Sequence, residues 1–338
     1  MTPPPEMTAL VADARCDGVE AALGKLRVAR VPTPRPARGQ VLVRIHATPC
    51  NPADLYYLEG RYGIDRPFPS TPGFEGAGEV VASGGGLLGR WLVGKRVACG
   101  GHSCSGTWAE YCVADSNQCL PLKNGLTFEQ GATALANPMT AIALASLVRK
   151  GGRRAFVQSA AAGQLGRMIL SVTSEKGITG VHVVRRKEQA DSLRALGAAH
   201  VLVSTDSNFD TELAARCREL GATIALDAVA GEMTGRLLQA LPARGEVVVI
   251  GSMSGEPCGG INPMALCFGD RRVRGFELAA HLRQLGLWGS FRLGNAAQRR
   301  VADGLSTNIR ARLPLADAPA GLRDYARAMS DGKMLIIP

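Results

Sequence analysis

The chain of 338 residues is 46% hydrophobic and 20% charged, a length and balance that predict a soluble globular protein of two domains and exclude a disordered one. Its net charge of +10 does not indicate nucleic-acid binding, because the basic residues are spread along the chain in short groups such as Arg185-Arg186-Lys187. With no apolar run suited to a membrane span, no secretory leader in Met1-Thr-Pro-Pro-Pro-Glu and nine cysteines without a pairing pattern, we expect a cytoplasmic protein with reduced thiols.

The first third of the chain is predicted to form short β-strands joined by turns. Apolar runs at residues 9–14 and 41–47 are expected strands, and residues 31–39 carry prolines and a glycine that favour turns. Glycine, proline and asparagine then interrupt short runs up to about residue 126. We therefore place a first, β-rich domain at residues 1–127.

The pattern changes at residue 128, where an alanine- and leucine-rich helix is expected to run to residue 148 with an interruption near Asn137 and Pro138. Strands and helices alternate after it. The expected strands are residues 155–159, 181–185, 201–203, 223–227, 246–250 and 273–276, and the expected helices are residues 165–176, 187–196 and 211–220. This alternation predicts an α/β domain with a doubly wound parallel sheet over residues 128–271. The tail from residue 278 is expected to hold helical pieces and a final strand at residues 334–337.

A turn of small residues in this α/β segment indicates a dinucleotide site. Ala161, Gly163 and Gly166 follow the spacing of a dinucleotide-binding turn, with alanine in the first glycine position. Small residues let the backbone approach a pyrophosphate, and the N-terminus of the following helix supplies N–H donors. An expected strand precedes the turn and an expected helix follows it, which favours this interpretation over a packing contact between small residues.

The end of the next expected strand favours NADPH over NADH. An NAD-preferring site places Asp or Glu there to bind the ribose hydroxyls, whereas this chain has Arg185 and Arg186. Their guanidinium groups can pair with the 2′-phosphate of NADPH through charge-assisted hydrogen bonds. The alternative is that the two arginines only begin a helix in solvent.

Further motifs are shared with one enzyme superfamily. They are Asn51-Pro-Ala-Asp-Leu-Tyr-Tyr-Leu-Glu-Gly-Arg-Tyr-Gly, Thr71-Pro-Gly-Phe-Glu-Gly-Ala-Gly, Gly106-Thr-Trp-Ala-Glu-Tyr, Asn137-Pro-Met-Thr-Ala and Arg274-Gly-Phe. Through them almost the whole chain resembles the medium-chain dehydrogenase/reductase superfamily, and most closely its zinc-free quinone oxidoreductases and trans-2-enoyl thioester reductases. The resemblance implies a GroES-like substrate domain built from both ends of the chain, a Rossmann domain between them, and a homodimer formed through the edges of the Rossmann sheets. Residues 272–338 would then supply an edge strand of the Rossmann sheet and return to the substrate domain.

The resemblance also implies that no catalytic metal is bound. The zinc ligands of the alcohol dehydrogenases in this superfamily fall at Asn51, at Phe74 and near Ala136 in this chain, and none of these residues is a ligand of the required kind. Oxidation of an alcohol is therefore not favoured, because it relies on a Lewis acid. A second, structural zinc site is not expected either, because the candidate cysteines lack the closely spaced Cys-x-x-Cys pairs of such a site. They are expected to be ordinary thiols: Cys99, Cys104, Cys112 and Cys119.

The resemblance further implies which groups face the substrate. Tyr62 matches a tyrosine that enoyl thioester reductases use near the reacting carbon and that quinone oxidoreductases also carry. Its phenol could stabilise charge on a carbonyl oxygen or relay a proton; the alternative is a wall that only shapes the pocket. Asn51 and Thr140 are expected polar neighbours. Glu277 stands where the enoyl reductases have tryptophan, which keeps the quinone-like interpretation level with the enoyl one.

We therefore expect a zinc-independent, NADPH-dependent oxidoreductase that reduces a small quinone or conjugated carbonyl compound by hydride transfer. A trans-2-enoyl thioester reductase of fatty-acid metabolism is the alternative of the same class, and a non-catalytic NADPH-binding redox sensor or RNA-binding protein is the alternative of another class. The expected catalytic residues are Tyr62 and Asn51. The expected cofactor-binding residues are Thr140, Ala161, Gly163, Gln164, Leu165, Gly166, Arg185, Arg186, Gly251 and Met253.

Overall fold

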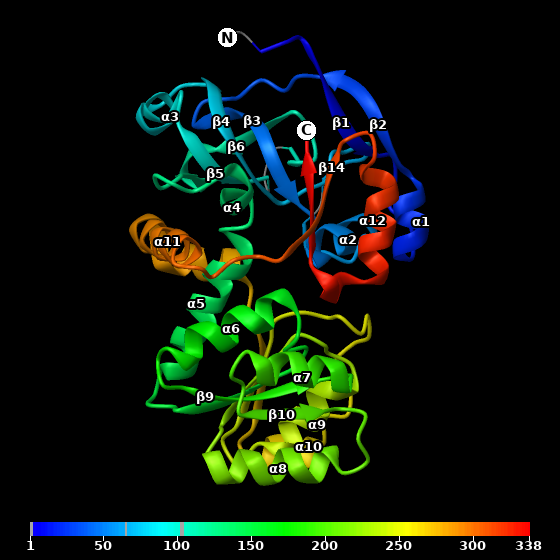
Figure 1. The fold of residues 1–338 in the computed structure, drawn as a ribbon, viewed down its shortest axis with the longest axis vertical. Coiled ribbons are helices and arrows are strands. Elements are labelled where there is room, and N and C mark those ends of the chain that lie inside the picture. The colour runs from blue at the N-terminus through cyan, green and yellow to red at the C-terminus, as the bar shows by residue number, and fades with distance from the viewer. Residues whose placement is uncertain (1–2, 65, 102–104) are drawn as a thin grey trace. The chain divides into compact units, whose positions relative to one another are not determined.

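The computed structural model describes residues 3–64, 66–101 and 105–338 (Figure 1). The chain forms two compact units, of which the first comprises Met1–Pro138 and Phe291–Pro338 and the second Met139–Ser290. Both ends of the chain thus contribute to the first unit. The boundary falls at Pro138 rather than at residue 127, because helix α4 (Phe128–Ala132) packs on the strands of the first unit. No helix in the described part of the chain is long and apolar enough to span a membrane.

A parallel sheet forms the centre of the second unit, whose residues 139–290 are all described. Its strands in chain order are β8 (Ala155–Gln158), β9 (Thr179–Val184), β10 (His200–Val203), β11 (Ile224–Asp227), β12 (Glu246–Val249) and β13 (Arg272–Gly275). In space their order is β10-β9-β8-β11-β12-β13, and every neighbouring pair is parallel. The order reverses between β8 and β11, which makes this the switch point at which doubly wound sheets bind ligands. The predicted α/β class with a Rossmann-type sheet is confirmed.

Helices connect the strands of this sheet: α6 (Gln164–Ser174), α7 (Lys187–Ala195), α8 (Phe209–Leu220), α9 (Glu232–Ala240) and α10 (Pro263–Cys267). Apolar residues of the strands, such as Val157 and Ala225, pack with Leu213 of α8 and Leu237 of α9 in one buried cluster. The sequence analysis missed α9. A glycine inside a short segment weakens a helical pattern, yet at Gly235 a Cβ would stand 2.2 Å from a backbone oxygen of the facing loop.

The first unit is rich in β-structure, as predicted. Among its described residues, the strands β3 (Gln40–Pro49), β4 (Glu75–Ser83), β5 (Arg96–Gly100), β6 (Tyr111–Asp115), β7 (Cys119–Pro121), β14 (Ile309–Pro314) and β15 (Lys333–Ile337) form one sheet. Their spatial order is β14-β15-β3-β4-β5-β7, with β6 paired to β3. A separate antiparallel pair joins β1 (Glu6–Ala12) to β2 (Leu26–Pro32). The last strand of the chain therefore lies beside β3 from its first third.

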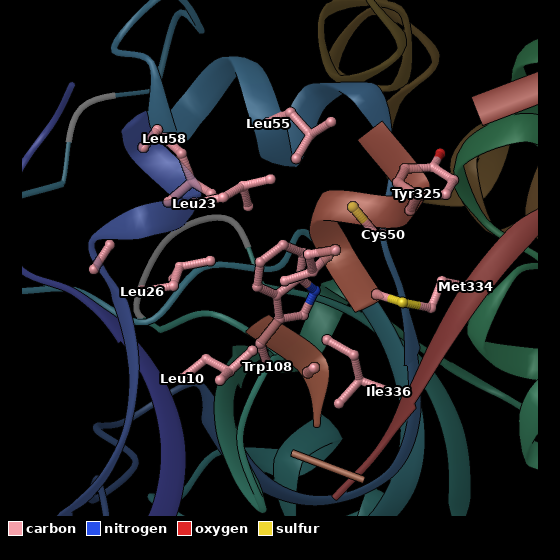
Figure 2. Packing of buried hydrophobic residues seen from close by; sticks show 14 of the residues in the cluster. Leu10, Leu23, Leu26, Cys50, Leu55, Leu58, Trp108, Tyr325, Met334 and Ile336 are labelled. Atoms are coloured by element: carbon pink, nitrogen blue, oxygen red, sulfur yellow. The ribbon is translucent and has the colours of Figure 1, made fainter. Parts of the chain in front are cut away.

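Helices cover part of this sheet and close its apolar core. They are α1 (Val19–Gly24), α2 (Pro52–Leu58), α3 (Leu87–Leu92) and α12 (Ala318–Arg327), with short 3-10 turns at Ser116–Gln118 and Met329–Asp331. Figure 2 shows the indole of Trp108 among the side chains of this core. Trp108 is fully buried, and its Nε1 donates a hydrogen bond to the carbonyl oxygen of Pro49 at 3.1 Å. The core thus fixes the end of β3, from which the chain enters α2.

The helix expected over residues 128–148, with an interruption near Asn137 and Pro138, is two helices, α4 and α5 (Ala136–Arg149), and the break lies just before these two residues. Pro138 lies in the first turn of α5, where its missing N–H removes no helical hydrogen bond. The strands β2 and β14 were also missed, because arginines interrupt the apolar pattern on their exposed positions. The long segment α11 (Leu278–Ala302) is two helical pieces joined at Gly286, whose φ is 67°.

Candidate functional site

The turn after β8 is built from small residues that hold the backbone close to α6. Gly163 is the N-cap of α6, and Ala160 has a left-handed φ of 49°. A Cβ on Gly166 would stand 2.4 Å from the carbonyl oxygen of Ala161, so only glycine fits in this first helical turn. The turn and the helix start bring together Ala161, Gly163, Gln164, Leu165 and Gly166. Their arrangement, with the N–H groups of a helix start beyond a strand end, suits a pyrophosphate.

A buried carboxylate that the sequence analysis did not single out holds this turn. Asp227, at the end of β11, accepts hydrogen bonds from Ser159 Oγ and Thr234 Oγ1, each at 2.7 Å, and from the Val229 N–H at 2.9 Å. Because Ser159 directly precedes the turn, the carboxylate ties the turn to the loop after β11. The available signal was an aspartate at the carboxyl end of a buried strand.

Arg185 and Arg186 follow β9, the strand beside β8, and both side chains are exposed. Their backbone N–H groups donate to Gln189 Oε1 at 3.2 Å each, and Thr205 Oγ1 donates to the Arg185 carbonyl oxygen at 3.2 Å. In the described part of the chain, neither guanidinium group forms an ion pair with a carboxylate. Since neighbouring parallel strands end at the same edge, the two cations lie on the edge that carries the turn.

The other three expected cofactor residues lie in two elements of the structure, the loop after β12 and helix α5. Gly251 and Met253 follow β12 on this same edge, where the Met253 N–H donates to the Ala228 carbonyl oxygen at 3.0 Å. A Cβ on Gly251 would lie 3.1 Å from that oxygen, so the backbone passes close to the loop after β11. Thr140 instead lies half-buried in the second turn of α5, the helix that precedes β8.

Tyr62 lies half-buried in the loop that follows α2. Its ring centroid is 5.0 Å from that of Phe74, which is 6% exposed and belongs to the core of the first unit. The guanidinium of Arg66 lies over the Phe74 ring, 5.1 Å from its centroid. The expected zinc-ligand position at residue 74 therefore holds an aromatic side chain beside Tyr62, with no atom that could bind a metal.

Asn51 is the N-cap of α2 and the centre of a buried polar group that we call the Asn51 cluster: Asn51, Asp54, Glu75 and Lys333. The Asn51 N–H donates to Asp54 Oδ2 at 2.7 Å, and its Nδ2 donates to Glu75 Oε1 at 2.9 Å. Its Oδ1 accepts a hydrogen bond from Lys333 Nζ. Glu75 Oε2 in turn accepts from the Ala136 N–H at 2.9 Å. Two of the three expected zinc-ligand positions, Asn51 and Ala136, are thus joined through a carboxylate instead of a metal.

Burial and mutual attraction shift the ionisation of this cluster in opposite directions. Burial raises the pKa of Asp54 to about 7 and also raises the pKa of Glu75. Burial lowers the pKa of Lys333, while the charge of Glu75 raises it in part. Asp54 Oδ1 has no hydrogen-bond partner among the described residues. Sequence reasoning named Asn51 but missed Lys333, because nothing in the sequence links positions 282 residues apart.

The described residues do not fit a catalytic or structural zinc ion. Among the described residues, no three His, Cys, Asp or Glu side chains lie together as a metal-binding group. Cys99, Cys112 and Cys119 lie in an apolar cluster between strands of the first unit, and burial raises the pKa of the Cys99 and Cys119 thiols. Such thiols are poor metal ligands, because the thiolate is the form that binds. Cys104 lies outside the described residues.

Glu277 lies at the surface of the second unit, just after β13. Its Oε2 accepts a hydrogen bond from Arg283 Nη2 at 3.4 Å. Together with Lys150, Phe276 and His281, it lines a hollow of about 420 Å³. The carboxylate that distinguishes this chain from the enoyl reductase pattern is therefore exposed and already paired with a cation.

Family models match both units. The model of the alcohol dehydrogenase GroES-like domain matches residues 37–124, and the model described as zinc-binding dehydrogenase matches residues 164–285. The first match falls on the β-rich first unit and the second on the Rossmann-type second unit. The second match does not include Asn51, Phe74 or Ala136, the positions at which zinc ligands would be expected.

Individual relatives are similar to the chain over most of its length. An enoyl-[acyl-carrier-protein] reductase of Caenorhabditis elegans is 31% identical, over 72% of this chain and 70% of the relative. The corresponding mitochondrial protein of Arabidopsis thaliana is 27% identical, over 76% and 69%. A candidate NADPH:quinone reductase of Mesorhizobium loti has a solved structure with a TM-score of 0.92 and 34% identity, and the match covers 100% of both chains. A mycobacterial structure in complex with NADPH shares the fold, with a TM-score of 0.82, 24% identity and coverage of 98% and 100%.

Proposed function

Because the chain belongs to the medium-chain dehydrogenase/reductase superfamily, we propose that it is a zinc-independent, NADPH-dependent oxidoreductase that reduces a quinone or another conjugated carbonyl compound. The observation that carries the proposal is the turn at residues 159–166 with Arg185 and Arg186 on the same sheet edge. The turn would hold the pyrophosphate, and the two guanidinium groups would hold the 2′-phosphate. Bound NADPH supplies the hydride.

The residues of the first unit would then serve the substrate. Addition of hydride to the β-carbon of a conjugated carbonyl compound moves the π electrons onto the carbonyl oxygen, and a proton must follow. The Tyr62 hydroxyl is a suitable donor to that oxygen or a relay for the proton. No metal contributes to this scheme, since Asn51, Phe74 and Ala136 do not form a zinc site.

The relatives support two substrate classes equally. The worm relative is named as an enoyl-[acyl-carrier-protein] reductase and the Mesorhizobium relative as a candidate NADPH:quinone reductase. Enoyl reduction adds hydride to the β-carbon and quinone reduction yields a hydroquinone, but both build negative charge on a conjugated oxygen and can therefore use the same oxyanion stabilisation. A non-catalytic NADPH-binding sensor or RNA-binding protein is the alternative outside this class.

The proposal is tested by NADPH oxidation, followed by near-ultraviolet absorbance, with a panel of quinones, enones and trans-2-enoyl thioesters. Turnover with at least one class, and much slower turnover with NADH, is the expected result. NADPH binding without oxidation by any acceptor would favour the non-catalytic alternative and reject the enzyme.

We also propose that the protein is a cytoplasmic homodimer joined at the β13 edge of its sheet. β13 is the last strand in the sheet order, and an edge strand offers unpaired backbone groups to a second copy. Exposed apolar side chains of the preceding segment support this, with Phe268 84% exposed and Met264 54% exposed. Sedimentation analysis should give a dimer, and Phe268→Glu should shift it toward monomer. The described cysteines form no disulfide bond with one another, in keeping with a reducing compartment.

A further inference from the structure

The side chain of Asn51 is held between a buried cation and a buried anion. Lys333 Nζ donates to its Oδ1, and its Nδ2 donates to Glu75 Oε1 at 2.9 Å. Lys333 and Glu75 are each only 4% exposed. An ammonium group can only donate hydrogen bonds, and an ionised carboxylate can only accept them. The two charged partners therefore fix which end of the carboxamide is oxygen and which is nitrogen, an assignment that is otherwise ambiguous.

The backbone holds both partners in place. The Glu75 carbonyl oxygen accepts hydrogen bonds from Thr48 Oγ1 at 2.8 Å and from Thr107 Oγ1 at 2.9 Å. A Cβ on Gly73, two residues earlier, would stand 2.4 Å from Thr107 Oγ1, so the chain turns tightly here with a φ of 100°. On the other side, Lys333 Nζ also donates to the Cys50 carbonyl oxygen at 3.2 Å. The carboxamide is thus set by rigid elements rather than by a mobile loop.

This arrangement leaves one donor unused. A carboxamide has two N–H groups on its nitrogen, and only one of them is needed for the bond to Glu75. In the described part of the chain, the second Asn51 N–H has no acceptor. Asn51 itself is only 7% exposed, so its side chain is largely withdrawn from bulk water. A buried unpaired donor costs stability, which a bound acceptor would recover.

We propose that Lys333 and Glu75 are positioning residues, which lock the Asn51 carboxamide so that its remaining N–H donates a hydrogen bond to the carbonyl oxygen of the substrate. This inference rests on the proposed function, because it concerns the oxygen that becomes negative when hydride adds to the β-carbon. The donor stabilises that oxygen without transferring a proton; the proton comes from Tyr62 or water. In the proposed zinc-independent reaction, a fixed N–H group takes over part of the stabilisation that a Lewis acid would give.

The alternative role of Lys333 is purely structural, as a counter-ion for Glu75 and Asp54. Both roles predict that removing the ammonium lowers stability, since it leaves buried carboxylates uncompensated. Only the positioning role predicts that Lys333 acts on the reaction through Asn51. The two roles therefore differ in how substitutions at the two positions combine.

The test is a double-mutant cycle on turnover at saturating NADPH, with whichever conjugated carbonyl compound the wild type reduces. Lys333→Met and Asn51→Ala should each lower kcat by about a hundred-fold, the loss expected for one oxyanion donor. The double variant should be no slower than Asn51→Ala alone, and NADPH affinity should stay within about two-fold. Lys25→Met, which removes an exposed lysine of the same unit, is the matched control. Ethylammonium should restore part of the kcat of Lys333→Ala, because it supplies the missing ammonium.

Two outcomes overturn the inference while the proposed function stands: an active wild type whose Lys333→Met variant keeps its kcat, and losses that multiply in the double variant. If Lys333→Met does not fold, Asn51→Ala decides alone, and an unchanged kcat refutes the role of the carboxamide. If no conjugated carbonyl compound supports NADPH oxidation by the wild type, the proposed function is refuted, and the inference falls with it.

Discussion

Replacing Arg185 and Arg186 by alanine should remove most of the preference of the protein for NADPH over NADH. Both guanidinium groups are exposed, follow β9 and lack a carboxylate partner among the described residues. They are therefore available for the 2′-phosphate, the group that distinguishes NADPH from NADH. The backbone at this site is held independently, by the hydrogen bonds to Gln189 Oε1, so the substitutions should not disturb the turn.

The size of the effect follows from the exposure of these side chains. A hydrogen bond to a charged group contributes about 1.5–3 kcal/mol, and exposure places this contact at the lower end because solvent screens it. Loss of one to two such contacts weakens NADPH binding by roughly ten- to a hundred-fold. The effect should shrink as salt is raised, because exposed charges are screened over about 8 Å at physiological ionic strength.

The assay is a fluorescence titration of both cofactors with the wild type and with Arg185→Ala/Arg186→Ala. The dissociation constant for NADH should change by less than about two-fold, since NADH has no 2′-phosphate. Arg194→Ala, which removes an exposed arginine of the following helix α7 that is paired with Asp191 at 2.9 Å, is the control and should leave both constants unchanged. An equal loss for NADPH and NADH would refute the assignment of the arginines to the phosphate.

The other predictions concern three residues of the two units. Tyr62→Phe keeps the ring beside Phe74 and removes the hydroxyl, so kcat with an enone should fall by about a hundred-fold or more. Unchanged turnover with every substrate would mean that Tyr62 only shapes the pocket. Gly166→Ala places a Cβ against a backbone oxygen, a strain of about 1–3 kcal/mol that should weaken binding of both cofactors roughly five- to a hundred-fold in titrations. Burial lowers the pKa of His182 to about 4 from an ordinary 6.5, so the unfolded state takes up its proton first. The free energy of unfolding should therefore fall by up to about 3 kcal/mol between pH 6.5 and 4, and a His182→Gln variant with the same pH profile in urea titrations would contradict this.

The sequence predicted the parallel sheet well, because buried strands at residues 155–159, 181–185 and 223–227 alternate with helices in a way that few folds allow. The turn at Ala161–Gly166 could also be predicted, because a close approach of the backbone requires small residues at fixed spacing within one short segment. The strands β2 and β14 were not, because arginines on their exposed faces hide the apolar alternation. Local pattern thus suffices where both faces of a strand are buried and fails where one face is in solvent.

The site shows the same division. Tyr62, Asn51 and the arginines could be named from short motifs, whereas Lys333 enters the Asn51 cluster only because β15 pairs with β3. That pairing joins the last strand of the chain to its first third, and no local propensity encodes it. Asp227 is an intermediate case, visible as an aspartate at a strand end but not as the acceptor that holds the Ser159 turn.

The central claim is that NADPH delivers hydride to the conjugated system of a carbonyl compound, without a metal. The most direct measurement is a single turnover with NADPH deuterated at the transferred position and an enone, after dialysis against a chelator, with the product analysed by mass spectrometry and NMR. We predict one deuterium at the carbon β to the carbonyl group and an undiminished rate in the chelated protein. Deuterium at the carbonyl carbon, or activity that is lost with the chelator and restored by zinc, would contradict the account.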